Sequence, residues 1–272
     1  MAEPRQEPLP RPSLLDAQSL TVVRDGRDVV GGIDMSVAAG ECVGVIGPNG
    51  SGKTSLLAAL RGLLLHRGTL QLQGVPLSSY RRRDVARLVA VVPQRLEFAF
   101  PYTVEEMVLL GRTPFRRPWE GFHGDDRAAV QRVLERLQLA ALAGERVDRL
   151  SGGERRKVFL ARALVQETPL VFLDEPLAGL DPAAKSDLLH WIQELRGDGR
   201  GVIAVLHEVH VAAQLCDRVI GLGDGRQQWG GSPADVLQPE RLEALFGVAW
   251  NEYRDTDGRS VLLPQRGREG DR

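Results

Sequence analysis

A glycine-rich loop that ends in a lysine and a threonine is the feature of this sequence with the clearest chemistry. The loop consists of Gly47, Pro48, Asn49, Gly50, Ser51, Gly52, Lys53 and Thr54. Its glycines let successive backbone N–H groups converge on phosphate oxygens, and a helix that starts there adds a positive dipole end. We expect Lys53 to reach the β- and γ-phosphates of ATP and the Thr54 hydroxyl to ligate Mg²⁺, with Ser55 beside them. A flexible turn with a solvated lysine is the weaker alternative.

Two adjacent carboxylates form the second candidate site. Asp174 and Glu175 directly follow the apolar run Leu170–Leu173, so they are expected at the end of a buried strand. Active sites of open parallel sheets lie at the carboxyl ends of their strands. Asp174 is therefore placed to hold the Mg²⁺ shell, and Glu175 to polarise the attacking water as a general base. An isolated pair of this kind is more often a solvated strand end, but the glycine loop upstream reverses that balance.

A second glycine pair stands at the start of a predicted helix. Ser151, Gly152, Gly153 and Glu154 precede a stretch, 155–164, with helical periodicity. The spacing of Ser151 and Glu154 is that of a capping box, which accounts for the cap but not for the glycines. Two glycines in a first helical turn cost roughly 1 kcal/mol each relative to alanine. Bare amides at a helix N-terminus bind anions. Because one ATP already has its cradle at Lys53, this motif is predicted to complete the nucleotide pocket of another subunit.

These candidate residues need a sheet to position them. Short apolar runs bounded by turns recur along the chain, at Glu41–Ile46, Leu88–Val92, Leu170–Asp174, Val202–Leu206 and Arg218–Leu222. Helical patterns separate several of the runs, and this alternation predicts an α/β fold with a mostly parallel sheet. Shorter strand candidates lie at Leu15–Val23, Ile33–Val37 and Thr69–Leu72. They predict an antiparallel sub-domain at one edge.

Strand signals disappear in the middle of the chain, where helices are expected instead. The expected helices are Thr103–Gly111, Asp126–Leu139 and Gly152–Val165. The first of them opens with a capping box of Thr103 and Glu106. We therefore predict a nucleotide-binding α/β core formed by residues 14–93 and 166–250, with a helical sub-domain, 94–165, inserted into it. The proline-rich residues 1–13 and the charged residues 264–272 are expected to be mobile tails.

Composition and charge limit the classes of function. The chain has 272 residues, a formal net charge of −1 and an apolar fraction of 43%. These values are ordinary for a globular protein and unlike the basic footprint of a nucleic-acid binder, so no nucleic acid is expected as a partner. Two cysteines, Cys42 and Cys216, are too few for a disulfide framework and fit a reduced compartment. No apolar stretch reaches the roughly 18–20 residues of a membrane span, and the proline-rich start has no signal-peptide core. Any membrane role is expected to come through a partner.

The motifs above stand in one ordered series with Gln94, Asp181 and His207. This series, over about residues 14–248, resembles the ATP-binding subunit of ABC transporters. The resemblance implies a P-loop NTPase fold and hydrolysis of ATP with Mg²⁺. It also implies a dimer of two copies that sandwiches two ATP molecules head to tail. That arrangement agrees with the second anion site inferred from Gly152 and Gly153.

The resemblance gives roles to single residues. Gln94 is similar to the Q-loop residue, which senses Mg²⁺ or the attacking water and links to the membrane partner. Asp181 resembles the D-loop contact across the dimer, although an aspartate before a proline also reads as a helix N-cap. His207, after an apolar run, resembles the switch histidine that contacts the γ-phosphate. His210, three residues on, is expected on the same helix face and is the weaker candidate.

One position departs from the family pattern. Such subunits usually present an aromatic ring to adenine from a short loop upstream of the glycine cradle, but the corresponding stretch, Val23–Gly26, has none. Arg24 could stack its planar guanidinium on the base, or it could be a solvated turn residue. Both interpretations stay open, and binding of the base is less firmly predicted than binding of the phosphates.

Further segments are similar to the bacterial importers of iron-siderophores, haem and cobalamin. They are Val91–Gln94, Phe98–Glu106, Leu110–Pro114, Pro233–Val236 and Leu242–Val248. This similarity implies separate permease subunits, a substrate-binding protein that acts through them, and a peripheral place on the cytoplasmic face of the bacterial inner membrane. The aromatic residues Phe98, Phe100 and Tyr102 beside Gln94 could form a groove for a permease helix. Alternatively, they pack the core of the helical sub-domain.

Other functions are compatible with parts of this series. An ABC ATPase for another substrate, such as molybdate, would carry the same motifs. A soluble ABC ATPase of DNA repair or chromosome architecture would need long heptad arms or zinc insertions, and neither is present in the sequence. A regulatory module with negligible turnover would not need both Glu175 and His207.

Overall fold

A ten-stranded sheet organises the chain in this computed structural model, which describes residues 12–94, 100–117, 119–254, 256 and 260–265. The strands of the sheet are β1 (Ser13–Arg24), β2 (Arg27–Ala38), β3 (Cys42–Ile46), β4 (Leu65–Leu72), β5 (Val75–Pro76), β6 (Val89–Val92), β7 (Leu170–Asp174), β8 (Gly201–Val205), β9 (Arg218–Gly223) and β10 (Arg226–Gly231). Their order across the sheet is β5-β4-β1-β2-β10-β9-β3-β8-β7-β6. A separate hairpin near the C-terminus pairs β11 (Trp250–Arg254) with β12 (Ser260–Pro264).

Half of the sheet is parallel, and it carries the predicted buried strands. β6, β7, β8, β3 and β9 pair in parallel along their whole shared length. All five residues of β3, β7 and β8 are buried. Alternate residues of β7 enter two hydrophobic clusters, with Val171 and Leu173 in one and Leu170 and Phe172 in the other. A sheet covered on both faces explains why these strands appear in the sequence as unbroken apolar runs.

The other half of the sheet is antiparallel, as predicted for one edge. β1 pairs with β2 and β4, and β4 pairs with β5. One parallel pair, Gly31 with Arg226, joins this half to β10. The predicted bounds Ile33–Val37 and Thr69–Leu72 were too short, because β2 begins with the polar pair Arg27 and Asp28 and the first residues of β4 are mostly exposed, so neither start shows apolar alternation. The result confirms an α/β fold with a mostly parallel core and an antiparallel edge.

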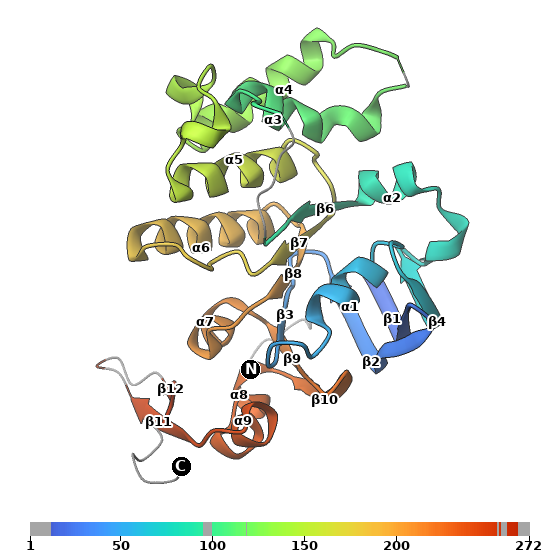
Figure 1. Ribbon diagram of the computed structural model, residues 1–272, viewed down its shortest axis with the longest axis vertical. Coiled ribbons are helices and arrows are strands. Elements are labelled where there is room, and N and C mark those ends of the chain that lie inside the picture. Colours follow the sequence, from blue (N-terminus) through green and yellow to red (C-terminus); the bar gives the residue numbers. More distant parts are fainter. Residues whose placement is uncertain (1–11, 95–99, 118, 255, 257–259, 266–272) are drawn as a thin grey trace, which may run out of the picture.

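Helices cover the sheet and fill the middle of the chain. They are α1 (Lys53–Ala59), α2 (Arg82–Leu88), α3 (Val104–Leu109), α4 (Gly124–Arg136), α5 (Gly152–Leu164), α6 (Pro182–Gly197), α7 (Val209–Leu215), α8 (Pro233–Val236) and α9 (Pro239–Phe246), together with the 3₁₀ segments Leu77–Ser79, η2 (Leu110–Phe115), Ala140–Leu142 and Val147–Arg149. Figure 1 shows α3, α4 and α5 grouped beyond β6, with α1 on the other side of the parallel strands, next to β1 and β2.

The three helices predicted for the middle of the chain are present, with two corrections. The first ends as an α-helix at Leu109 and continues as the 3₁₀ segment η2, which contains Pro114. Proline cannot continue an α-helix, because its ring removes a donor and clashes with the preceding turn. The second helix ends at Arg136 rather than Leu139, since Gln138 has a left-handed backbone with φ 59°. The division into a core and a helical sub-domain remains a prediction.

A buried carboxylate ties η2 to α4. Asp126 is fully buried, and its carboxylate pairs with the guanidinium groups of Arg112, at 3.1 Å, and Arg116. The backbone N–H of His123 donates to the same carboxylate at 3.0 Å, an ordinary hydrogen-bond distance. Burial alone raises the pKa of Asp126, but these hydrogen bonds and charges lower it further than burial raises it. The cluster therefore depends on the ionised carboxylate.

Two further observations concern membrane-spanning helices and the cysteines. No helix among the described residues is long and apolar enough to cross a membrane. The thiols of Cys42 and Cys216 are both free and buried, and their sulfur atoms lie 3.8 Å apart.

Candidate active site

The glycine-rich loop connects β3 to α1 as predicted. Lys53 is buried, and its ammonium donates to the carbonyl oxygens of Gly47 at 2.9 Å and Pro48 at 2.8 Å. Two of the glycines are required by the fold of the chain itself. A Cβ on Gly47 would lie 2.0 Å from the carbonyl oxygen of Leu222, and Gly52 has φ 100° with Val30 in the way of any side chain. The loop therefore holds one conformation, in which two of its carbonyl groups bind the lysine.

A cavity of about 400 Å³ opens over this loop. It is lined by Arg24, Val29, Asn49, Gly50, Gly52, Lys53, Thr54, Ser55 and Glu175. Lining residues from β1, β2, the glycine loop and the end of β7 thus meet in one place. The cavity brings together the predicted phosphate-binding residues, Arg24 and one of the two carboxylates. Val29, on β2, was not predicted, because nothing in its own sequence neighbourhood places that strand next to the loop.

Asp174 lies at the end of β7, beside Thr54. The Thr54 hydroxyl lies close enough to its carboxylate to lower its pKa, and the buried Oδ1 has no hydrogen-bond partner among the described residues. Burial and the neighbouring charge of Glu175 raise the pKa of Asp174, against smaller opposite effects of Thr54, Arg61 and Lys53. Mg²⁺ is usually bound through one or two protein oxygens together with substrate phosphates. A hydroxyl next to an unsatisfied carboxylate oxygen fits such an ion.

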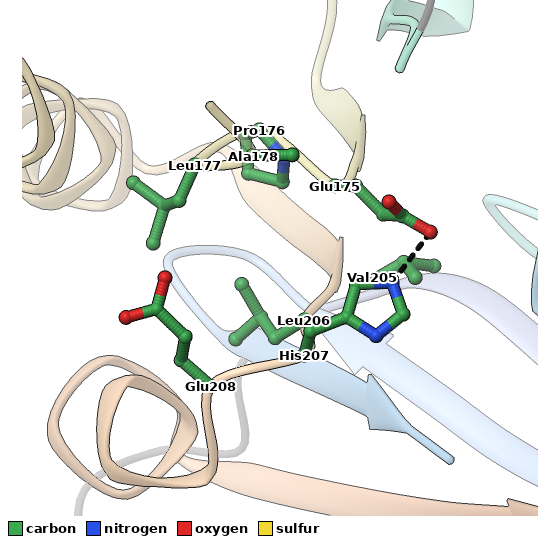
Figure 2. A pocket seen from close by; sticks show the side chains of 8 residues that line it. All are labelled: Glu175, Pro176, Leu177, Ala178, Val205, Leu206, His207 and Glu208. Carbon is green, nitrogen blue, oxygen red and sulfur yellow. Dashed lines mark ion pairs between the residues drawn. The ribbon is translucent and has the colours of Figure 1, made fainter. Parts of the chain in front are cut away.

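Glu175 has two polar side chains against its carboxylate. The ring Nε2 of His207 lies 2.6 Å from its Oε1, and the side-chain amide of Gln94 donates to its Oε2. Figure 2 shows the glutamate and the histidine pointing toward each other across a small pocket next to Val205. The backbone of Glu175 is left-handed, with φ 48°, and its N–H donates to the Val205 carbonyl oxygen at 3.2 Å. Such strained conformations of non-glycine residues concentrate at functional sites.

Four neighbouring parallel strands deliver these side chains to one edge of the sheet. Gln94 follows β6, the carboxylates end β7, His207 follows β8, and the lysine follows β3. Strand ends that lie next to each other bring together residues far apart in the sequence. One expectation about this edge was wrong. His207 precedes α7, which begins at Val209, so it does not share a helix face with His210, whose ring pairs with Glu208 at 3.4 Å instead.

The second glycine motif caps α5 as predicted. The backbone N–H of Ser151 donates to Glu154 at 2.9 Å, and the N–H of Glu154 donates back to the Ser151 hydroxyl at 3.3 Å. The fold of the chain does not itself require the glycines. A Cβ on Gly152 would meet no described atom within 4 Å, and one on Gly153 would make an ordinary contact with Ala184 at 3.6 Å. None of these four residues lines the cavity over Lys53.

Three other predicted residues have defined places. The Ser51 hydroxyl is buried and has no partner among the described residues. Asp181 caps α6, because its carboxylate accepts the N–H of Ala184 at 2.9 Å, so the N-cap interpretation is confirmed. Arg24 borders the cavity, but 62% of its side chain is exposed and it lies 3.7 Å from Asp25. Its stacking on a base remains a prediction, as does a contact of Asp181 across a dimer.

The comparisons with known proteins agree with this geometry. Residues 30–178 match the family model described as ABC transporter, which is more than half of the chain. The chain belongs to the ABC transporter family. Among its relatives, the hemin import ATP-binding protein HmuV of Pseudomonas fluorescens is 39% identical over 241 residues, covering 86% of this chain and 93% of the relative. HmuV of Streptomyces coelicolor is 39% identical over 259 residues, covering 93% and 90%.

Other members of the ABC transporter family are similar in sequence or in fold. The cobalamin import ATP-binding protein BtuD of Halobacterium salinarum is 37% identical over 235 residues, which cover 85% of this chain and 58% of that protein. A solved ATP-binding subunit of an ABC transporter superposes with a TM-score of 0.73 at 26% identity, covering 87% of this chain and 95% of its own. A metal-chelate type ABC transporter in an inward-facing conformation shares the fold, with a TM-score of 0.83 at 23% identity, covering 94% and 98%. The chain is thus an ABC ATPase.

Proposed function

We propose that this ABC ATPase powers an importer that takes up an iron chelate, such as a siderophore or haem, or cobalamin, through separate permease subunits. The observation that carries the ATPase part is the contact of Glu175 with both Gln94 and His207 at the edge of the Lys53 cavity. The cargo rests on the relatives, since those nearly as long as this chain are named for hemin import. A BtuD relative named for cobalamin import keeps that cargo in the proposal.

In this proposal each residue of the site has a separate role in hydrolysis. Lys53 and the loop amides bind the β- and γ-phosphates, and Thr54, Asp174 and Gln94 would hold Mg²⁺, which neutralises charge on the phosphates when it is bound. Glu175 accepts the proton of the attacking water as general base. His207, at 2.6 Å, holds the carboxylate of Glu175 in place, and the family resemblance gives it a contact with the γ-phosphate.

The working form in this proposal is a head-to-tail dimer. Gly152 and Gly153 have room for side chains in the chain itself, so their lack of side chains supports close approach by another molecule. A nucleotide held by Lys53 of a second copy has the charge that suits the free amides of this helix N-terminus. The D-loop residue Asp181 would lie between the two sites.

Permease subunits would dock beside Gln94. Phe100 is 63% exposed, and its ring meets that of Tyr102 edge-on with centroids 6.0 Å apart. Tyr102 also packs against the main hydrophobic cluster. Phe98, the third aromatic residue of the predicted groove, lies outside the described residues. In this proposal the ATPase sits on the cytoplasmic face of the inner membrane, and the substrate-binding protein acts through the permease.

Substitution of the general base tests the enzymatic part. Glu175→Gln is expected to lower steady-state turnover by roughly 10²–10⁴-fold, the range that general-base catalysis contributes, while ATP still drives dimerisation. Glu208→Gln is the matched control, because Glu208 is a nearby carboxylate whose partners are Lys185 and His210. Equal turnover of wild type and Glu175→Gln would refute the role of this residue.

Transport assays test the cargo. The wild-type ATPase, reconstituted in vesicles with its permease and the matching binding protein, is expected to accumulate haem, a ferric siderophore or cobalamin in an ATP-dependent manner. The same assembly with Glu175→Gln serves as the control. Accumulation of molybdate alone, or stimulation of hydrolysis by DNA in place of transport, would favour the alternative functions.

A further inference from the structure

Arg156, in the second turn of α5, has an unusual environment for an arginine. Only 7% of it is exposed. Its guanidinium donates to the carbonyl oxygens of Pro93 at 3.2 Å, Gln94 at 3.4 Å and Ala178 at 3.3 Å. No carboxylate among the described residues forms an ion pair with it. Three backbone carbonyls therefore compensate a buried cation, which is costly unless it is well hydrogen-bonded.

The three carbonyl groups belong to two segments that form the catalytic site. Pro93 and Gln94 follow β6, and the Gln94 side chain contacts Glu175. Ala178 follows Glu175 by three residues, and its N–H donates to the Glu175 carbonyl oxygen at 3.2 Å. Burial lowers the pKa of Arg156, and the charge of Glu175 partly restores it. The guanidinium thus joins the backbone of the segment after β6 to that of the segment after Glu175.

Arg156 also belongs to the helix that starts with the second glycine motif. It comes three residues after Gly153, which is less than one turn of an α-helix, or roughly 5 Å along the axis. Because helices are stiff over this distance, a displacement of the glycines carries the guanidinium with it. The planar fork of arginine can bond in two directions at once, which the single ammonium of lysine does less well.

We propose that Arg156 is a positioning residue that couples the two nucleotide sites of the dimer. In this inference, which rests on the proposed function, a nucleotide held by the partner subunit engages Gly152 and Gly153. The resulting shift of α5 moves the Arg156 guanidinium, and its hydrogen bonds set the backbone of Gln94 and Ala178. Glu175 of the same subunit then takes its catalytic position. One arginine thereby connects the partner's nucleotide to hydrolysis at this subunit's own site.

The first test compares ATP kinetics of Arg156→Lys and Arg156→Gln with wild type. The lysine variant keeps the charge and is expected to fold, but its single ammonium bridges the two segments less well. We expect kcat to fall about tenfold, within the range that coupling residues show, and the Hill coefficient for ATP to fall toward 1, with KM changed less than threefold. Lys157→Met is the matched control, because Lys157 is the next residue of α5 and pairs with Asp187 on α6 at 2.7 Å.

The outcomes separate this inference from the proposed function. If wild type does not hydrolyse ATP, the proposed function fails. If wild type hydrolyses ATP and Arg156→Lys matches it in both kcat and Hill coefficient, only the role of Arg156 is refuted. A wild-type Hill coefficient of 1, or an equal loss in Lys157→Met, would refute it too.

Mixed dimers test whether Arg156 acts on its own subunit. When one subunit carries Arg156→Lys and the other Glu175→Gln, the only working base lies in the arginine variant, and turnover is expected to fall about tenfold. When both changes are in one subunit and the other is wild type, turnover is expected to equal that of a wild-type and Glu175→Gln pair. If turnover falls in the second dimer alone, Arg156→Lys damages the glycine motif that faces the partner subunit. That result would overturn the inference.

Discussion

The ring Nε2 of His207 lies 2.6 Å from Oε1 of Glu175, while the amide of Gln94 donates to the other oxygen, Oε2. Both oxygens of the carboxylate therefore have a polar partner in the isolated chain. A general base must turn one oxygen toward the attacking water. Each oxygen can accept a second hydrogen bond, so the two contacts hold the carboxylate in place and still leave lone pairs for the attacking water.

Removal of the histidine should lower turnover more than it lowers binding of ATP. We expect His207→Ala to reduce kcat by roughly 10²-fold, because the carboxylate loses the group that orients it, and to change the affinity for ATP little. His210→Ala is the matched control, since that ring pairs with Glu208 instead. Steady-state kinetics and nucleotide titration measure the two effects. More than half of the wild-type kcat in His207→Ala would contradict this role.

Alanine substitutions should separate the two kinds of glycine. Gly153→Ala is expected to raise the free energy of unfolding by up to about 1 kcal/mol, because alanine favours a helix, and its Cβ has room at 3.6 Å from Ala184. The same variant should lower ATP-driven dimerisation and turnover at least tenfold. Gly47→Ala should instead destabilise the chain, because its Cβ would lie 2.0 Å from the Leu222 carbonyl oxygen.

Thermal unfolding and light scattering with ATP measure both effects. If Gly153→Ala dimerises with ATP as well as wild type does, nothing approaches this residue closely.

Neutralisation of Asp174 should stabilise the chain without nucleotide. Burial and the charge of Glu175 raise the pKa of Asp174, so its ionised form is disfavoured in the folded state. The destabilisation is full above the raised pKa and disappears as the pH falls below the ordinary carboxyl value. We expect Asp174→Asn to raise Tm at pH 7 by roughly 2–4 °C, the change that about 1 kcal/mol produces in a chain of this size, and to weaken binding of Mg²⁺ with ATP.

The Tm difference between wild type and Asp174→Asn should shrink as the pH falls from 7 toward 4. Asp125→Asn, at an exposed aspartate of α4, is the control and should leave Tm unchanged at each pH. A difference that grows on acidification would refute the sign of this effect.

Neutralisation of Asp126, unlike that of Asp174, should destabilise the chain. Asp126→Asn leaves the guanidinium groups of Arg112 and Arg116 without their shared carboxylate, and breaking a buried ion pair costs roughly 3 kcal/mol. Tm should therefore fall by about 6–12 °C. Since the pKa of Asp126 is lowered, the stabilisation is complete above the ordinary carboxyl pKa and is lost only as the pH falls through the lower folded value. If Asp126→Asn has the same Tm as Asp125→Asn at pH 7, the predicted destabilisation is wrong.

The parallel strands and the residues at their ends could be predicted because their burial is local in the sequence. β3, β7 and β8 are apolar throughout, since both faces of that part of the sheet are covered. β10 was not predicted, because half-buried and exposed residues alternate along it and its glutamines bond to other strands, as Gln227 does to the N–H of Asp34 at 2.9 Å.

Arg156 was not predicted for a related reason. Arg155, Arg156 and Lys157 are consecutive in the sequence, and such a run of charges is typical of solvent-exposed positions. Only the packing of the segments after β6 and β7 against α5 buries Arg156. The contact between His207 and Glu175 likewise follows from the adjacency of β7 and β8. Neither residue's sequence neighbours carry that information.

Helix α5 is fastened at both ends. Its first turn carries the capped glycines, and near its last turn Gly111 comes so close that a Cβ there would lie 2.3 Å from the Arg162 carbonyl oxygen. Arg112 adds a hydrogen bond to the Val165 carbonyl oxygen at 2.9 Å. A helix of 13 residues is about 20 Å long. Because the helix is rigid, a displacement of its glycine end would move Arg156 with it and would also be transmitted, through Gly111 and Arg112, to η2.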